Sequence, residues 1–277
     1  MGTVSVSLPS DGTTADVSDY NSPITTLVNE FNGGIDNDNI ASGAAIAGSK
    51  VADNSIDLEA KASVDTGWRE VSDSWTYASA TSITVPSDAT LKYSVGDKLR
   101  LTQSTVKYFY ITAVGATTLT ITGGTSYTLV NAAISDISYS KAESPLGHPI
   151  WLNYTPTITN ITNTNGTLVG RFAMHGRTVK YYFKFTLGSS SAIGTNPSFS
   201  LPVPIHANYT QTATTVGVGL LQDTGTNQYP AVNDRTSTAD TVRFVTAASP
   251  LAAVTATAPF TWTTSDTLWS TGSYEAA

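Results

Sequence analysis

The sequence predicts a mostly β protein with a short N-terminal helix, an extended stalk, a small β-barrel or sandwich, and a C-terminal jelly-roll-like β-sandwich. Thr, Ser, Asn, Gly and aromatic residues dominate while Leu, Glu and Lys are scarce, a balance that favours strands and turns. After residue 64, short runs of alternating apolar and polar residues recur between Gly, Pro and Asn residues. At 277 residues the chain is long enough for two such domains.

Residues 1–19 are predicted to form an extended attachment arm. Val4, Val6 and Leu8 alternate with polar residues in a short strand pattern that Pro9 ends. A lone strand exposes unpaired backbone groups, so we expect this one to add to the sheet of a partner protein. A frayed terminus is the alternative.

Residues 20–64 begin with a predicted helix from Pro23 to Phe31. Ser22 is placed to cap it, and Pro23 suits the first helical position because its missing N–H costs nothing there. Gly33-Gly34 would end the helix. The apolar residues are spaced as on one helical face: Ile24, Leu27, Val28 and Phe31.

Beyond this helix the apolar residues form a ladder that fits neither a helix nor a strand. They recur five or six positions apart among small and polar residues: Ile35, Ile40, Ile46, Val51 and Ile56. A single chain cannot bury so thin a ladder, whereas several parallel copies can place these residues on a common axis. We therefore predict an oligomerisation stalk, and the alternative is a disordered linker with accidental isoleucines.

Residues 65–143, the first β module, are predicted to contain about five short strands. The clearest pair is Tyr108–Val114 and Thr118–Thr122, which flank a Gly115-Ala116-Thr117 hairpin connection. Residues 127–134 read as a helical turn. Residues 144–154 are rich in Pro and Gly and read as a linker.

Residues 155–277, the second β module, are predicted to be a sandwich of about eight strands. His175-Gly176 reads as a two-residue hairpin connection, and Leu221–Asp234 as a surface loop. The expected strands are 155–161, 168–174, 177–187, 199–203, 214–221, 241–246, 260–263 and 267–274. One wall of the core is expected from the alternation of Val179, Tyr181, Phe183, Phe185 and Leu187.

Four stretches resemble segments of tailed-bacteriophage fibre and appendage proteins. The stalk contains IDNDNIASGAAIAGSKVAD, the first β module contains GWREVSDSWTYASATSITVPSDATLKYSVGDKLRL, and the second contains YTPTITNITNTNGTLVGRFAMHGRTVKYYFKFTLG and FTWTTSDTLWSTGSYEAA. The resemblance covers nearly all of the chain after residue 19. It implies a homotrimer at the virion surface, with the second β module at the distal tip.

Composition argues against several other classes of protein. The net charge is −7 with no Lys/Arg cluster, so we expect no nucleic-acid partner. No window approaches the ~20 apolar residues that a membrane span needs, so no membrane insertion is expected. The first residues lack the features of a secretory signal. There is no cysteine, and therefore no disulfide or thiol chemistry.

The motifs that usually carry catalysis or metal binding are incomplete in this chain. Ser104 and Lys107 match a Ser-x-x-Lys pattern, but they lie in a strand context without the accompanying motifs. Asp36 and Asp38 begin like a calcium loop that lacks its Gly and closing Glu. The three histidines lack metal-ligand spacing: His148, His175 and His206. We therefore expect no catalytic residue, no metal and no cofactor.

Aromatic and polar residues of the second β module are the remaining candidates for binding a surface ligand. Aromatic faces stack on sugar rings, while Asn, Asp and Thr hydrogen-bond to hydroxyl groups. The candidates are Tyr209, Tyr229, Asn233, Asp234, Trp262 and Trp269, with Tyr274 near the end of the chain. The alternative is that Trp262 and Trp269 belong to a core or a subunit interface.

The expectation that follows is a non-enzymatic virion structural protein. It would be a homotrimeric fibre or spike, fixed to other virion proteins by its N-terminal arm, whose tip binds a host-surface glycan or protein. A capsid decoration fibre without a receptor role is the first alternative. A polysaccharide depolymerase is disfavoured because the chain has no long β-helix pattern and no evident carboxylate pair. A secreted carbohydrate-binding module is disfavoured by the lack of a signal sequence.

Overall fold

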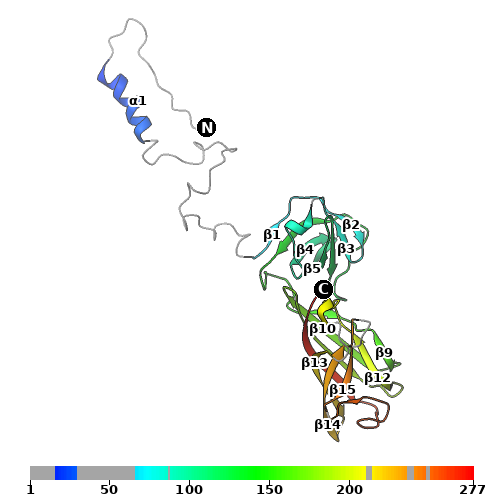
Figure 1. Ribbon diagram of the computed structural model, residues 1–277. Helices are drawn as coiled ribbons and strands as arrows, with labels where there is room; N and C mark the ends of the chain where they lie inside the picture. Colours follow the sequence, from blue (N-terminus) through cyan, green and yellow to red (C-terminus); the bar gives the residue numbers. More distant parts are fainter. Residues whose placement is uncertain (1–15, 30–65, 87, 210–213, 236–239, 248–249) are drawn as a thin grey trace. The chain divides into compact units, whose positions relative to one another are not determined.

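The computed structural model describes residues 16–29, 66–86, 88–209, 214–235, 240–247 and 250–277. The chain divides into two compact units, residues 1–60 and residues 61–277. The described part of the first unit is one helix, and the second unit contains two antiparallel sheets (Figure 1). The predicted mostly β class is therefore confirmed.

The helix α1 spans Val17–Asn29 and begins six residues before Pro23. The predicted cap at Ser22 and the first-turn position of Pro23 are therefore wrong. Pro23 lies inside the helix, where it has no N–H to donate to the carbonyl of Asp19. The helix continues through this lost bond, and the Thr26 hydroxyl donates to the Ser22 carbonyl at 2.9 Å.

The apolar residues of α1 are exposed in the single chain. The exposed fractions are 57% for Ile24, 39% for Leu27 and 47% for Val28. The other residues predicted to drive oligomerisation lie outside the described residues, as does the predicted strand at residues 4–8: Phe31, Ile35, Ile40, Ile46, Val51 and Ile56. The stalk therefore stays a prediction.

The first β module is a seven-stranded antiparallel sheet that curves into a half-barrel (Figure 1). Its strands lie side by side in the order β1-β7-β4-β5-β6-β3-β2. They are β1 (Arg69–Glu70), β2 (Thr76–Ser79), β3 (Ser82–Thr84), β4 (Lys98–Gln103), β5 (Thr105–Val114), β6 (Thr118–Thr122) and β7 (Ser135–Ser140). The short 3-10 helix η4 (Ala89–Leu91) follows β3. The predicted hairpin of β5 and β6 is confirmed.

The predicted helical turn at residues 127–134 is wrong. This segment has no helix, and the side chain of Leu129 is buried in the core of the first module. Its backbone is satisfied by the buried Gln103, whose Nε2 donates to the carbonyls of Val130 at 2.9 Å and Ala132 at 3.0 Å. Because Gln103 Oε1 also accepts from the Val130 N–H, the segment needs no helical hydrogen bonds of its own.

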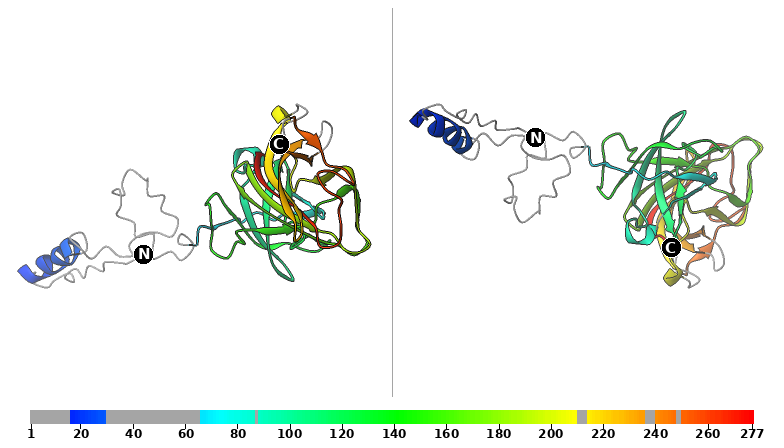
Figure 2. Two further views of the ribbon diagram at one scale, coloured as in Figure 1. Left: turned by 90° about the horizontal axis from the view of Figure 1, so that it is seen from below. Right: turned by 90° about the horizontal axis from the view of Figure 1, so that it is seen from above.

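The second β module is a ten-stranded antiparallel sheet. Nine strands lie in the order β8-β10-β11-β17-β13-β14-β15-β12-β9, and β16 pairs with β15. The strands curve around a common core in a sandwich-like fold (Figure 2). They are β8 (Leu152–Tyr154), β9 (Ile158–Thr162), β10 (Thr167–His175), β11 (Thr178–Thr186), β12 (Ala192–Ser200), β13 (Thr215–Asp223), β14 (Asn227–Arg235), β15 (Thr241–Thr246), β16 (Ala252–Ala253) and β17 (Thr267–Glu275). The 3-10 helix η5 spans Ala207–Tyr209.

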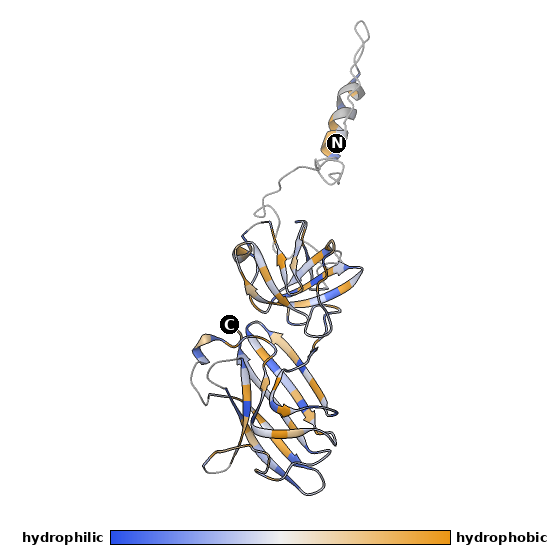
Figure 3. Ribbon diagram, turned by 90° about the vertical axis from the view of Figure 1, so that its right-hand side faces the viewer, coloured by the Kyte–Doolittle hydropathy of each residue, from blue (hydrophilic) through white to orange (hydrophobic). Residues whose placement is uncertain are grey.

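The predicted core wall of the second module is confirmed. Apolar and polar residues alternate along the strands, as Figure 3 shows by colour. Each inward side chain of β11 and the residue after it is at most 3% exposed: Val179, Tyr181, Phe183, Phe185 and Leu187. Two glycines of β13 make room for rings of this core. A Cβ atom at Gly217 would lie 2.4 Å from the Tyr181 hydroxyl oxygen, and one at Gly219 would lie 2.6 Å from Phe244.

Three other strand predictions need correction. The connection between β10 and β11 is Gly176-Arg177, because His175 pairs with Thr178 inside the ladder. The expected strand at residues 155–161 begins only at Ile158, because Pro156 lies in the break between β8 and β9. Residues 260–263 form no strand.

The two β modules share contacts. Tyr110 of β5 belongs to the core of the second module, and its ring centroid lies 6.0 Å from that of Phe172. The Thr125 N–H donates to the Asn153 carbonyl at 2.7 Å. The predicted linker 144–154 is thus structured, since it contains β8 and the buried His148.

Candidate functional site

Asn233 and Asp234 lie on β14 and are buried, at 0% and 4% exposure, so their expected place in a surface loop is wrong. The loop that joins β13 to β14 is only residues 224–226. Asn233 Oδ1 accepts a hydrogen bond from the Ser270 hydroxyl at 2.6 Å. Asp234 holds Arg243 through two bonds of 2.8 Å, which raise the pKa of the guanidinium. Their polar groups are therefore engaged inside the module.

Tyr229 and Trp262 meet through a third ring, Phe260. Phe260 stacks on Tyr229 with centroids 5.2 Å apart and contacts Trp262 at 4.3 Å. The Trp262 indole N–H donates to the Thr255 carbonyl at 2.9 Å. All three rings pack against the core of the second module. They cover that core, and the sequence did not reveal Phe260 as the ring that joins them.

Tyr209 and Tyr274 lie elsewhere in the second module. Tyr209 ends η5, packs against the core and accepts a hydrogen bond from Arg235 through its carbonyl. Tyr274 is 3% exposed, and its hydroxyl donates to the Val203 carbonyl at 2.7 Å. Tyr274 is therefore a core residue.

Trp269 is the predicted residue that lies in the open face of the sheet. Its neighbours in sequence, Leu268 and Ser270, point into the core at 0% exposure, so Trp269 points outward, where it is half-buried. It lies opposite Lys184 of β11 on one side and Leu220 of β13 on the other. The sequence placed Trp269 near a loop, whereas the sheet places it in the middle of five strands.

Two cross-strand rows surround Trp269. They run across β10, β11, β17, β13 and β14, which lie side by side in that order. Every residue in them is half-buried or exposed, and we call these ten residues the outer face. The first row is Val169, Lys184, Trp269, Leu220 and Pro230, and the second is Arg171, Tyr182, Thr271, Val218 and Val232.

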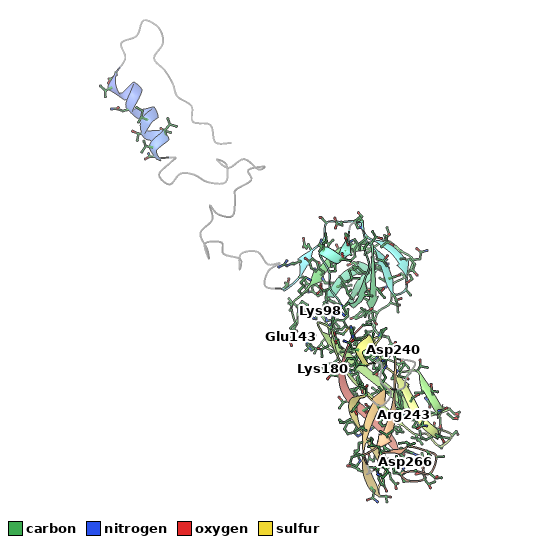
Figure 4. The ribbon with its side chains drawn as sticks, in the orientation of Figure 1. Lys98, Glu143, Lys180, Asp240, Arg243 and Asp266 are labelled. Carbon is green, nitrogen blue, oxygen red and sulfur yellow. The ribbon has the colours of Figure 1, made fainter. Side chains whose placement is uncertain are left out.

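The outer face carries positive charge and no negative charge. Arg171 and Lys184 are its only ionisable residues besides Tyr182. Among the described residues neither cation forms an ion pair. Lys180 lies one row further along β11, opposite Ser273, and is labelled in Figure 4. The arrangement joins an aromatic ring, apolar side chains and free cations on one side of a sheet.

The other side of the same strands is closed to solvent. The Ser270 hydroxyl lies 3.4 Å from the Tyr181 hydroxyl and 2.6 Å from Asn233, and all three residues are 0% exposed. Burial raises the pKa of Tyr181 to about 12, so this cluster stays neutral at physiological pH. A ligand can therefore approach these strands only from the outer face.

The first β module contains a cavity of about 410 Å³ that sequence reasoning did not find. Its lining includes the carboxylates of Glu70, Asp73 and Asp136 together with Arg100. Arg100 lies over the Trp68 ring and donates to the Ser138 hydroxyl at 3.2 Å. Within the described ranges, no three His, Cys, Asp or Glu side chains are arranged to hold a metal.

A smaller cavity of about 220 Å³ lies where the two β modules meet. His148 and Tyr110 line it, as do Glu143 and His175, with the His175 Nδ1 and a Glu143 carboxylate oxygen 3.2 Å apart. His148 is 7% exposed, and burial together with the charge of Lys98 lowers its pKa to about 4. The negative charge of Glu143 also lies near Lys98, where it partly offsets the lowering of the Lys98 pKa by burial. Figure 4 labels both residues.

Among the described hydrogen bonds, none joins Ser104 to Lys107. Ser104 sits in the tight turn between β4 and β5 at a φ of 61°, and the Lys107 ammonium donates to the Thr128 carbonyl at 2.7 Å.

The helix α1, the one described α-helix, lacks the length and apolar character needed to cross a bilayer. No protein-family model, curated protein or solved structure matches the chain.

Proposed function

We propose that this protein is a virion structural protein of a tailed bacteriophage. In this proposal it forms a homotrimeric fibre or spike on the tail or capsid, attached to other virion proteins through residues 1–19. The second β module binds a glycan on the host surface and performs no catalysis. The observation that carries the binding role is the outer face, which offers Trp269 and two free cations on a rigid sheet.

Three further features support this assignment. The stretches quoted above resemble phage appendage proteins along most of the chain after residue 19. The division into residues 1–60 and 61–277 suits a protein that attaches by one part and presents the other. An all-β head with a packed core also suits a particle that must hold a binding surface rigid outside the cell.

Adsorption of the phage tests the proposal. Antibodies raised against residues 61–277 should label intact virions in electron micrographs. Purified full-length protein should slow adsorption of the phage to cells of its bacterial host, because it occupies the same receptor. Labelled virions without any effect on adsorption would favour a decoration fibre. Unlabelled virions would exclude a virion protein altogether.

A depolymerase is the second candidate, and the cavity with Glu70, Asp73 and Asp136 favours it. Glycosidases use two carboxyl groups about 5 to 9.5 Å apart, so three carboxylates around one cavity justify a direct test. Host envelope polysaccharide incubated with the protein should release no reducing ends. Release that Asp73→Asn or Asp136→Asn abolishes would establish the depolymerase instead.

A further inference from the structure

We propose that the outer face binds an acidic polysaccharide, with Trp269 stacked on a sugar ring and Arg171 and Lys184 paired with its carboxylate or phosphate groups. This inference rests on the proposed function, because it specifies the glycan class that the tip would recognise.

The size of the outer face fits a short stretch of polysaccharide better than a second copy of the chain. Strands lie about 4.8 Å apart, so five strands span about 19 Å, and successive outward residues on a strand lie about 7 Å apart. The two rows therefore cover only a few hundred Å², whereas a stable interface buries about 800 Å² on each partner. A narrow band across the strands matches an extended polymer.

The positive charge of the outer face favours an anionic ligand. Arg171 and Lys184 lie on neighbouring strands, one in each row, and neither row contains an Asp or Glu. Residues 155–277 contain six Lys or Arg and five Asp or Glu, and two of the acids, Asp234 and Asp266, are at most 4% exposed. Unpaired cations on a partly apolar surface attract anions more strongly than cations in open solvent.

The margin of the outer face supplies hydrogen-bonding groups. The next row toward the ends of β10, β13 and β14 holds Thr167, Gln222 and Gln228, of which Thr167 and Gln228 are exposed. Amide and hydroxyl side chains beside an aromatic ring are what a sugar with several hydroxyl groups requires. Trp269 itself is half-buried between Lys184 and Leu220, so its ring loses little freedom on binding.

An array of purified bacterial surface polysaccharides, acidic and neutral, tests the proposal with the full-length protein. We expect the protein to bind acidic polysaccharides and to lose binding when their carboxyl groups are chemically reduced or their phosphates removed. Affinity should fall as salt rises. Trp269→Ala and the double change Arg171→Gln with Lys184→Gln should each weaken binding about tenfold or more, and Trp269→Tyr should restore part of the loss because it keeps an aromatic face.

The matched control changes two cations away from the outer face. Arg69 and Arg177 are exposed, and Arg69→Gln with Arg177→Gln alters the net charge by the same amount. This variant should bind like the original protein. Thermal unfolding of every variant separates lost binding from lost folding.

Other outcomes overturn the inference in distinct ways. Equal binding of neutral polysaccharides, or binding that none of the outer-face changes weakens, excludes this site for acidic glycans. If light scattering shows that Trp269→Ala dissociates oligomers, the outer face binds a second copy of this chain and not a polysaccharide. If no polysaccharide binds but the protein still slows phage adsorption, the inference fails while the proposed receptor role stands. If adsorption is also unaffected, the receptor role fails too.

Discussion

His148 combines deep burial with a titratable side chain. It is surrounded by the rings of Trp68, Tyr108 and Tyr110, and its Nδ1 bonds to the Pro149 carbonyl at 2.9 Å. Its pKa falls to about 4 from an ordinary 6.5. Between those values the unfolded chain takes up a proton that the folded chain excludes, so protonation favours unfolding.

Stability should therefore fall as the pH drops from about 6.5 to 4 and should be insensitive to this residue above 6.5. Each pKa unit corresponds to about 1.4 kcal/mol, so the loss attributable to His148 at pH 5 is about 2 kcal/mol. Urea unfolding of His148→Gln and of the original protein at pH 5 and 7 measures it. His148→Gln should lose this part of the pH dependence of stability. The control His206→Gln, which changes a half-buried histidine, should keep it. Equal pH dependence in all three proteins would contradict the prediction.

Single residues also mark the limit of what the sequence predicted. Asn233 and Asp234 are of types usually found at surfaces, which explains their assignment to a binding loop. Their partners Ser270 and Arg243 lie 37 and 9 positions away, so nothing local reveals the pairing. The sequence listed Trp269 as one of several candidate rings. Its outward place beside Lys184 and Leu220 depends on the sheet order, which has no local signal.

Strands with a regular alternation of apolar and polar residues, or with clear turn residues between them, were predicted well. The alternation along β11 put its inward side chains in the core, and the β5–β6 hairpin followed from its turn residues. By contrast β14, with the sequence NQYPAVNDR, has polar residues and a proline that read as a loop. Pairing with β13 on one side and β15 on the other makes it a strand, and that long-range pairing has no local signal.

The side chain of Gln103 makes three hydrogen bonds to the backbone of Val130 and Ala132, in the segment that links β6 to β7. We expect Gln103→Ala to destabilise the first β module by about 1 to 3 kcal/mol, because the change removes a buried side chain and its hydrogen bonds to the backbone of Val130 and Ala132. Calorimetry should show the transition of the first module at lower temperature. Gln228→Ala, at an exposed position of β14, is the control and should leave it unchanged. An unchanged transition in Gln103→Ala would mean that water replaces the glutamine at no cost.

Assembly is a property of the whole molecule that the sequence predicts from residues 20–64. The exposed Ile24, Leu27 and Val28 of α1 are consistent with partner chains, although they do not establish them. Ile40→Asn together with Ile46→Asn should weaken a trimer while both β modules keep their circular dichroism. Light scattering at micromolar concentration measures the mass. A monomeric original protein would contradict the stalk, and Ser42→Asn is a control that leaves the ladder intact.

The contacts between the two β modules change the expectation for the isolated tip. The strand pattern of residues 155–277 by itself predicts that residues 144–277 fold independently, because the alternation shows a core of their own. However, Tyr110 of the first module packs on Phe172 and hydrogen-bonds to the backbone of Met174. Removing residues 61–143 therefore takes a buried ring out of the core of the second module.

We expect a fragment of residues 61–277 to keep the unfolding temperature that the second β module has in the full chain. A fragment of residues 144–277 should fold but unfold at lower temperature. In the longer fragment, Tyr110→Ala should reproduce most of that loss, about 3 to 5 kcal/mol as for other buried rings, and Tyr110→Phe should cost less because the ring remains. Calorimetry of the full chain, the two fragments and the two variants makes the comparison. If both fragments unfold at the same temperature, the second β module owes nothing to the first, and the two are joined only by the chain between them.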